Sequence, residues 1–286
     1  MSHPVLVPDA VAVITGGASG IGLAAAKKLA SLGLRVCIAD LGADRLARAR
    51  DAIVAAGKTT SEHIMTVETD VADRDALVAL EAAVRARFGG TDVLMNNAGI
   101  GPASSALHGP AQSWERLLAV NLWGVIHGTQ VFVPRMIDRG RPGLVINTGS
   151  KQGITTPPGN AGYNVSKAGV KAFTEALEHE LRNTKGCSIH AHLLIPGFVW
   201  TELTAAGRAD APKPAGAWTA EQTVDFMVER LEAGDFYILC PDNEVPRALD
   251  ERRILWAAGD IIENRPPLSR WHPGWADAFK AFVAKA

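Results

Sequence analysis

The sequence predicts an α/β fold, namely a doubly wound, mostly parallel sheet of the Rossmann type followed by a helical C-terminal extension. Short β-branched runs alternate with longer alanine-rich stretches over residues 1–200, and most of these runs are apolar without interruption. Strands that alternate with helices imply right-handed crossovers, and continuously apolar strands are typical of a sheet covered on both faces. We expect one domain over 1–286, with a core at 1–200, a loop, helix and last strand at 201–240, and an aromatic-rich extension at 241–286.

The individual elements follow from local patterns of apolar residues. A short apolar run predicts a strand, and a longer stretch with apolar residues at helical spacing predicts a helix. Strands are predicted at 11–14, 34–39, 64–67, 92–95, 144–147, 189–195 and 236–240. Helices are predicted at 21–32, 43–56, 73–88, 113–139, 161–183 and 220–232.

Composition changes after the core. The stretch 204–217 is rich in Ala, Gly and Pro, which is typical of a mobile loop. The C-terminal extension holds three of the seven tryptophans, Trp256, Trp271 and Trp275. So many aromatic side chains require burial, either over a substrate pocket or at a subunit interface.

Composition and charge also exclude several classes of protein. The chain is 47% hydrophobic and 21% charged, as in globular proteins, and its net charge of −1 argues against a nucleic-acid partner. No apolar run approaches the roughly 18 residues of a membrane span, and the N-terminus lacks the basic segment of a signal peptide. Cys37, Cys187 and Cys240 are widely spaced, which predicts a reducing, cytoplasmic location without disulfides. His190 and His192 share a strand face, but no third ligand is near, so no metal is expected.

A glycine-rich turn follows the first predicted strand and opens the first helix. Gly16, Gly20 and Gly22 allow a tight turn, close approach of the backbone to a pyrophosphate, and close packing of helix on strand. The helix N-terminus then offers unpaired N–H groups to an anion. No Lys-Ser/Thr pair follows the last glycine, so the turn is not a P-loop. The pattern predicts a dinucleotide site.

Asp40 ends the second predicted strand, twenty residues after Gly20. A carboxylate at this point can accept both hydroxyls of an adenosine ribose, whereas a 2′-phosphate would meet it with like charge. Neither Ser19 nor Leu41 offers a cation to neutralise a phosphate. We therefore predict NAD rather than NADP. The alternative interpretation is that Asp40 only caps the next helix.

Tyr163 and Lys167 lie four residues apart in a predicted helix, so their side chains share one face. A cation within about 4–6 Å favours phenolate and is expected to lower the pKa of the tyrosine. Such a tyrosine can move a proton to or from an alcohol. Ser150 follows the fifth predicted strand, at the edge where open α/β sheets bind ligands. Taken alone, the Tyr–Lys pair is also compatible with an ordinary surface pair.

Together these motifs resemble the short-chain dehydrogenase/reductase family in its shorter, non-extended form, over about residues 10–201. One departure is Gly149, where the family often has a second serine. The motifs that carry the resemblance are Thr15-Gly-x-x-x-Gly20-x-Gly22, Asn96-Asn-Ala-Gly99, Asn121, Ser150, Tyr163-x-x-x-Lys167 and Pro196-Gly197.

The resemblance implies a role for each matched residue. Tyr163 would be the acid/base, Lys167 its pKa modulator and a ligand of the nicotinamide ribose, Ser150 the group that orients the substrate oxygen, and Asn121 the anchor of a water in a proton relay. Candidate substrate contacts, chosen as neighbours of these residues, are Ser150, Gln152, Asn160 and Trp200. The implied cofactor contacts are Gly16, Ser19, Gly20, Ile21, Gly22, Asp40, Leu41, Asp70, Val71, Asn97, Ala98, Gly99, Tyr163, Lys167, Pro196, Gly197, Val199 and Thr201.

The leading hypothesis is an NAD(H)-dependent oxidoreductase that transfers a hydride between the nicotinamide and an apolar or aromatic secondary alcohol or ketone. The resemblance also implies a homodimer or homotetramer. One alternative is a catalytically silent dinucleotide-binding regulator or scaffold of the same fold. The complete set of Asn121, Ser150, Tyr163 and Lys167 argues against it. Epimerisation or dehydration with cofactor recycling is disfavoured because the glycine spacing is not the extended form.

Overall fold

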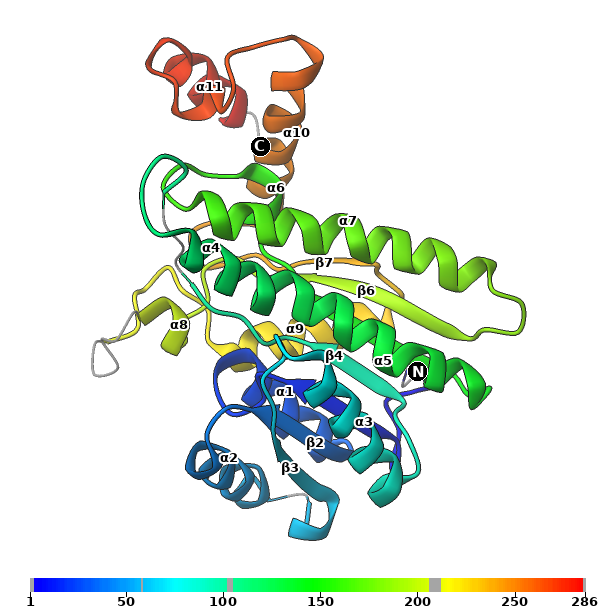
Figure 1. Cartoon of the computed structure of the whole chain (residues 1–286). Helices are drawn as coiled ribbons and strands as arrows, with labels where there is room; N and C mark the ends of the chain where they lie inside the picture. Colours follow the sequence, from blue (N-terminus) through cyan, green and yellow to red (C-terminus); the bar gives the residue numbers. More distant parts are fainter. Residues whose placement is uncertain (1–2, 58, 102–104, 206–211, 285–286) are drawn as a thin grey trace.

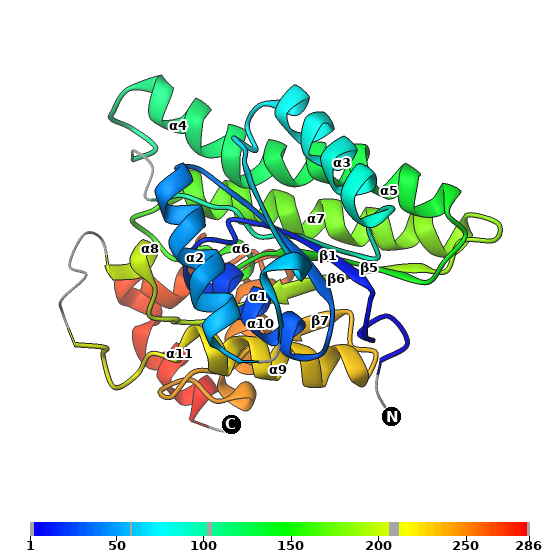
Figure 2. The same ribbon diagram turned by 90° about the horizontal axis from the view of Figure 1, so that it is seen from below.

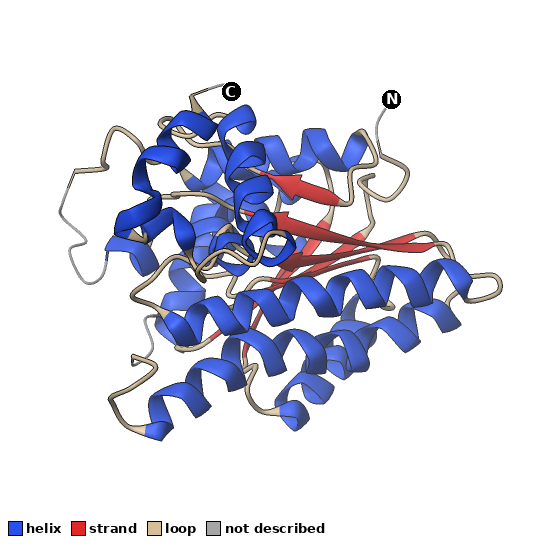
Figure 3. Cartoon of the chain, turned by 90° about the horizontal axis from the view of Figure 1, so that it is seen from above, coloured by secondary structure: helices blue, strands red, loops and turns tan. Residues whose placement is uncertain are grey.

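The computed structural model of the chain describes residues 3–57, 59–101, 105–205 and 212–284. Within them, seven parallel strands form one sheet in the order β3-β2-β1-β4-β5-β6-β7 (Figures 1 and 3). The direction of winding reverses between β1 and β4, which creates a crevice at the carboxyl ends of these two strands. The strands are β1 (Val11–Thr15), β2 (Arg35–Asp40), β3 (Ile64–Glu68), β4 (Val93–Asn96), β5 (Gly143–Thr148), β6 (Ile189–Ile195) and β7 (Tyr237–Leu239).

Helices cover both faces of the sheet, and Figure 2 shows the two helical layers on opposite sides of the strands. The alternation of side chains along β1 divides the core accordingly: Ala12 and Ile14 pack in one layer, Val11 and Val13 in the other. One layer contains α1 (Gly20–Ser31), α2 (Ala43–Ala55) and α9 (Ala220–Glu232), and the other α3 (Arg74–Phe88), α5 (Gly124–Asp138) and α7 (Ala161–Asn183).

The helix predicted at 113–139 is not uniform. It consists of α4 (Ala111–Leu118), a π-helical segment at Ala119–Trp123, and α5. π-Helical turns are rare and are frequently found at functional sites. By length and mean hydropathy, Ala111–Asp138 would also suffice to cross a membrane, although polar residues interrupt each apolar run. Half of its most apolar window is buried inside the protein, as in a helix that packs on a sheet.

The C-terminal extension folds into α10 (Arg247–Ile262), two 3₁₀ turns and α11 (Ala276–Val283), and it lies beyond α6 and α7 (Figure 1). Trp256 is buried at its centre, and the indole N–H donates to the Ser269 hydroxyl at 2.7 Å. The rings of Trp275, Phe279 and Phe282 surround Trp256 with centroid distances of 5.2–6.3 Å. The extension therefore buries much of its aromatic surface within itself.

The predicted elements agree with the structure except in a few places. The last strand is shorter than 236–240, and two four-residue helices, α6 (Gln152–Thr155) and α8 (Glu202–Ala205), were not expected. A helix of one turn shows no periodic pattern in the sequence. Residues 206–211 of the loop predicted to be mobile lie outside the described residues.

Candidate active site

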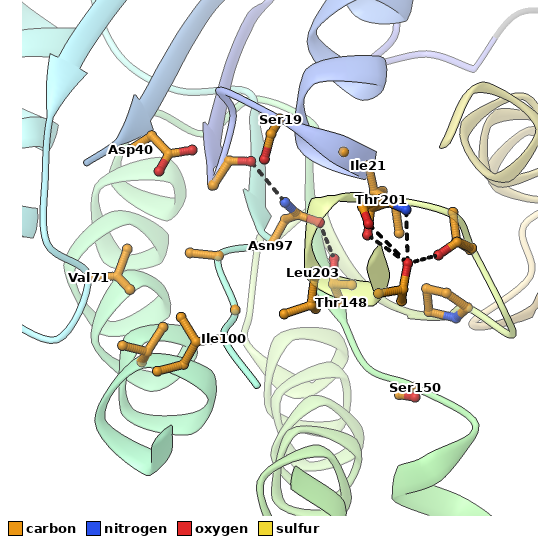
Figure 4. Close-up of a pocket in the computed structure, with 18 of the residues that line it drawn as sticks. Ser19, Ile21, Asp40, Val71, Asn97, Ile100, Thr148, Ser150, Thr201 and Leu203 are labelled. Atoms are coloured by element: carbon orange, nitrogen blue, oxygen red, sulfur yellow. Dashed lines mark hydrogen bonds between the residues drawn. The ribbon is translucent and has the colours of Figure 1, made fainter. Parts of the chain in front are cut away.

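A cavity of about 320 Å³ opens at the carboxyl ends of β1 and β4, where the winding of the sheet reverses. Figure 4 shows Asp40 at one end of it and Ser150 at the other. We call these the adenosine end and the catalytic end. The predicted residues that line the cavity are Gly16, Ser19, Gly20, Ile21, Asp40, Leu41, Asp70, Val71, Asn97, Ala98, Gly99, Ser150, Tyr163, Lys167, Pro196, Gly197, Val199 and Thr201.

The glycine turn between β1 and α1 leaves no room for side chains at Gly16, Gly17 and Gly22. Gly16 has φ +64°, and a Cβ there would lie 2.8 Å from the Ala98 Cα. A Cβ on Gly22 would lie 2.0 Å from the Gly16 carbonyl oxygen. Gly22 does not line the cavity within the described residues. It therefore allows close packing of α1 on the turn rather than the predicted contact with the cofactor. The turn exposes the N-terminus of α1, with its N–H groups, to the cavity.

Asp40 does not cap a helix, because the N-cap of α2 is Gly42. The carboxylate of Asp40 accepts hydrogen bonds from the backbone N–H groups of Ala18 at 2.9 Å and Leu41 at 2.8 Å. These two bonds orient the carboxylate against the glycine turn. The alternative interpretation of Asp40 is therefore wrong, and its negative charge stands at the adenosine end.

Arg45 was missed by the sequence interpretation, which found no cation near Asp40. It stands in the first turns of α2 and lines the cavity. Its guanidinium donates to the Ser19 hydroxyl at 2.5 Å and to the Glu202 carboxylate at 2.6 Å. No local pattern indicated these contacts, because Glu202, on α8, is 157 residues away along the chain. The positive charge of Arg45 is thus balanced within the protein.

Asp70 also faces the adenosine end, but it is not the N-cap of α3, which is Asp73. Asp70 accepts from the Ala72 N–H at 3.0 Å and pairs with Arg116 at 2.9 Å. Burial opposes ionisation of Asp70, but these two hydrogen bonds outweigh it and hold its pKa below the ordinary value. Arg116, from α4, is a second cavity residue that was not predicted.

Tyr163 and Ser150 meet at the catalytic end. Burial raises the pKa of the Tyr163 phenol above its ordinary value, and a hydrogen bond with the Ser150 hydroxyl partly lowers it. The Ser150 oxygen also accepts from the Gln152 N–H at 3.1 Å, which leaves the Ser150 proton available for donation. Two hydroxyl groups therefore meet on one side of the cavity, where an alcohol or carbonyl oxygen could replace water.

Lys167 is fully enclosed one turn after Tyr163. Its Nζ donates to the Thr148 carbonyl oxygen at 2.7 Å and lies 5.7 Å from the centroid of the Tyr163 ring. Burial lowers the pKa of the ammonium to about 8. The prediction that Lys167 lowers the pKa of Tyr163 is wrong for this structure, because desolvation of the phenol dominates and no influence of Lys167 on it is resolved.

Asn121 lies in the π-helical segment and is completely buried. Its amide oxygen accepts from the Ile100 N–H at 2.8 Å, and its amide nitrogen donates to the Ile100 carbonyl at 2.9 Å. The side chain thus fixes the loop after β4 rather than lining the cavity within the described residues. Asn121 would support the site from behind, while Ile100 itself lines the wall.

Three residues named as substrate contacts do not line the cavity within the described residues. Gln152 begins α6 and contributes its backbone N–H to Ser150. Asn160 is the N-cap residue of α7. Trp200 bonds through its backbone to Trp218 at 2.9 Å. The chain turns away from the cavity after Ser150, and contact of these three residues with a substrate stays a prediction.

The cavity walls include several further residues that no motif indicated. They come from strand ends, from the π-helical segment and from the segment after β6, and neither composition nor spacing distinguishes them from their neighbours in sequence. They are Ala39, Thr69, Val120, Thr148, Gly149, Leu203 and Thr204.

A parallel sheet with this cavity and glycine turn at its winding reversal defines a Rossmann-type nucleotide-binding fold. The short chain dehydrogenase family matches residues 10–212, and the chain belongs to the short-chain dehydrogenase/reductase family. Its enzymes act on hydroxyl or ketone groups of small molecules with a nicotinamide dinucleotide, and they are usually oligomeric.

Individual relatives extend this likeness to most of the chain. A 1-deoxy-11-beta-hydroxypentalenate dehydrogenase of Streptomyces avermitilis is 32% identical over 250 residues, covering 86% of this chain and 89% of the relative. A short-chain dehydrogenase/reductase from Burkholderia phymatum in complex with NAD is 32% identical with a TM-score of 0.81, covering 92% of this chain and 97% of that one. An alcohol dehydrogenase from Thermococcus sibiricus complexed with 5-hydroxy-NADP has 25% identity and a TM-score of 0.68, covering 78% and 90%. Relatives thus occur with either form of the cofactor.

Proposed function

We propose that the protein is an NAD(H)-dependent oxidoreductase that interconverts secondary alcohols and ketones, with Tyr163 as the acid/base. The observation that carries this proposal is that the Tyr163–Ser150 hydrogen bond and buried Lys167 line the same cavity as the glycine turn. A nucleotide on the turn would therefore share an enclosed space with the proton-transfer groups. A protein that only binds nucleotide has no need of such a pair.

The cavity fits a dinucleotide on its own features. The glycine turn admits backbone approach, the N-terminus of α1 attracts a pyrophosphate, and Lys167 lies near the catalytic end to hold ribose hydroxyls. When bound, the nicotinamide supplies hydride transfer chemistry. Ser150 would orient the substrate oxygen, and Tyr163 would exchange a proton with it.

The raised pKa of Tyr163 gives a direction to the proton transfer. The phenol is neutral at ordinary pH and can donate its proton to the oxygen of a ketone that is being reduced. In alcohol oxidation the same oxygen must accept a proton, so oxidation is expected to rise with pH.

Preference for NAD is supported by the geometry at the adenosine end. Asp40 is held there by two backbone N–H groups, so a 2′-phosphate would meet a fixed negative charge. Arg45 could attract that phosphate, but Glu202 already pairs with it. The net charge of the three side chains is −1, which favours a ribose with free hydroxyls.

An apolar substrate is supported by the wall of the catalytic end. Leu203 lines it with 43% of its surface exposed. A Cβ placed on Gly101 would lie 3.6 Å from the Tyr163 ring and 3.8 Å from Leu203, so these two side chains flank one open position. We further propose that the protein is cytoplasmic, because its three cysteines are widely spaced and no disulfide is expected. We also propose that it is a homo-oligomer, because enzymes of this family are usually oligomeric.

The test is a set of absorbance assays at about 340 nm, the reduced-nicotinamide band, with NAD and NADP against a panel of apolar and aromatic secondary alcohols and the corresponding ketones. Turnover with NAD well above that with NADP is expected. Equal use of both cofactors would contradict the NAD assignment. Tight NADH binding without turnover of any alcohol or ketone would instead favour a silent nucleotide-binding regulator.

A further inference from the structure

A buried group of charges lies behind the catalytic end, outside the cavity lining. The Nζ of Lys151 lies 3.3 Å from the Asp242 carboxylate and 2.5 Å from the Asp250 carboxylate. All three side chains are largely buried, with 17%, 6% and 6% of their surface exposed. Buried ions are costly unless they are paired, so these three must keep one arrangement. We call them the Lys151 cluster.

The Lys151 cluster touches the catalytic end through the backbone. Lys151 directly follows Ser150, and its N–H donates to the Pro196 carbonyl at 3.2 Å. The Asp242 carboxylate accepts from the Phe198 N–H at 3.3 Å. A Cβ on Gly197 would lie 2.7 Å from the Lys151 Nζ and 2.6 Å from the Asp242 carboxylate. The cluster therefore packs directly against the loop at 196–198, whose first two residues line the cavity.

The same cluster reaches the C-terminal extension. Asp250 stands on α10, which lies next to α6 just after Lys151 (Figure 1). The Asp242 carboxylate also accepts from the N–H groups of Glu244 at 3.2 Å and Val245 at 2.8 Å, which shapes the turn leading into α10. The segment that contains Ser150 and Lys151, the loop at 196–198 and the segment 242–250 thus meet around the Lys151 ammonium group.

We propose that Lys151 is a positioning residue that, through Asp242 and Asp250, holds Ser150 and the loop at 196–198 in their reactive arrangement and couples the extension to catalysis. This inference rests on the proposed alcohol–ketone activity. Substitution of Lys151 removes the ammonium that contacts both carboxylates and leaves Asp250 with the weaker electrostatic influence of Arg253. The repulsion between the two carboxylates is then expected to displace the turn, α10 or the loop. A displacement of about 1 Å at a catalytic group can lower turnover by about 100-fold.

The experiment compares Lys151→Met with Lys151→Arg, Asp250→Asn and a matched control, Arg139→Met. Arg139 is also a largely buried cation, 3.1 Å from buried Asp92. This pair, however, lies at the amino end of β4, whereas the cavity lies at the carboxyl ends of the strands. The readouts are kcat, KM, the Kd for NADH by fluorescence, and Tm. We expect Lys151→Met to lower kcat by about 10- to 100-fold, with a much smaller change in the Kd for NADH. Asp250→Asn should lower kcat less, and Lys151→Arg should restore most of it.

The control separates positioning from a general loss of stability. Arg139→Met should lower Tm to a similar extent but leave kcat nearly unchanged. If Lys151→Met retains wild-type kcat, or if both variants lose kcat in proportion to Tm, the proposal is overturned. Asp250→Asn, which keeps the shape of the side chain, decides the question by the same criteria if Lys151→Met does not fold.

Hydrogen exchange gives a readout that does not depend on turnover. Lys151→Met should speed exchange of the Phe198 amide, because this substitution removes the ion pair that holds the amide's acceptor, Asp242, in place. Arg139→Met leaves that ion pair intact and should not speed exchange at Phe198. A wild-type protein that turns over no alcohol or ketone would overturn the proposed function alone. Unchanged exchange at Phe198 would overturn the positioning role alone.

Discussion

At the adenosine end of the cavity, Asp40 and Asp70 are partly exposed, and they accept hydrogen bonds from backbone N–H groups and Arg116. At the catalytic end, Tyr163 is half-buried and Lys167 is fully buried, and desolvation changes their pKa values. Water screens charges at the adenosine end, whereas burial at the catalytic end disfavours the charged form of a side chain. We therefore expect single substitutions to alter selectivity modestly at the adenosine end and reactivity strongly at the catalytic end.

The largest effect is expected from Tyr163→Phe, which removes the proton-transfer group and keeps the ring. Turnover should fall by about 10²–10⁴-fold, while NADH binding, measured by fluorescence titration, stays close to wild type. Because the pKa of Tyr163 is raised, wild-type oxidation should increase with pH. The residual oxidation by the variant should lose this increase, and wild-type turnover in Tyr163→Phe would remove Tyr163 from the mechanism.

Lys167→Met should lower turnover by about 100-fold or more and also change how stability depends on pH. The pKa of Lys167 is about 8 in the folded protein against 10.5 for the free side chain, so the unfolded state binds more protons between these values. Wild-type stability should therefore gain a rising contribution from about pH 8 to 10.5 that the variant lacks. Below pH 8 the buried ammonium costs stability, because its folded pKa is depressed.

Denaturant unfolding at several pH values measures this contribution. Lys171→Met is the matched control, since Lys171 lies one turn further along α7 and pairs with Glu175 at the surface. The control should keep the wild-type rise above pH 8. The same rise in Lys167→Met would mean that Lys167 is not buried as described.

Asp40→Ala should have a smaller effect, confined to cofactor choice. Removing the carboxylate relieves repulsion of a 2′-phosphate and leaves Arg45 nearby, so the ratio of kcat/KM for NAD over NADP should fall by about 10-fold, equivalent to about 1.4 kcal/mol. Turnover at saturating NAD should change little. An unaltered ratio would show that Asp40 does not discriminate between the two cofactors.

Arg45→Ala is expected to have the smallest effect. The Arg45–Glu202 pair is partly exposed, with 39% and 65% of the side chains accessible, so its loss should change the free energy of unfolding by less than about 1 kcal/mol. The variant should use NADP even less than the wild type. Better NADP use after this substitution would show that Arg45 does not attract the phosphate.

Much of the fold and the site could be predicted because the signals were local. The glycine turn requires glycine at Gly16 and Gly22, since a Cβ would strike backbone atoms there. Helical spacing brought Tyr163 and Lys167 to one face. The substrate contacts were predicted less well, because Gln152 and Trp200 were chosen as neighbours in sequence, and the path of the chain after a strand does not follow from composition.

The sequence by itself determined the order of strands and helices, the glycine turn, the position of Asp40 and the spacing of the tyrosine and the lysine. Each depends on the conformational preferences of residues close together in the chain. Only the tertiary structure decided that Lys167 is buried, that Arg45 is neutralised by Glu202, and that Lys151 joins the extension to the site. Burial and ion pairing depend on side chains brought together from distant segments, and no local pattern records them.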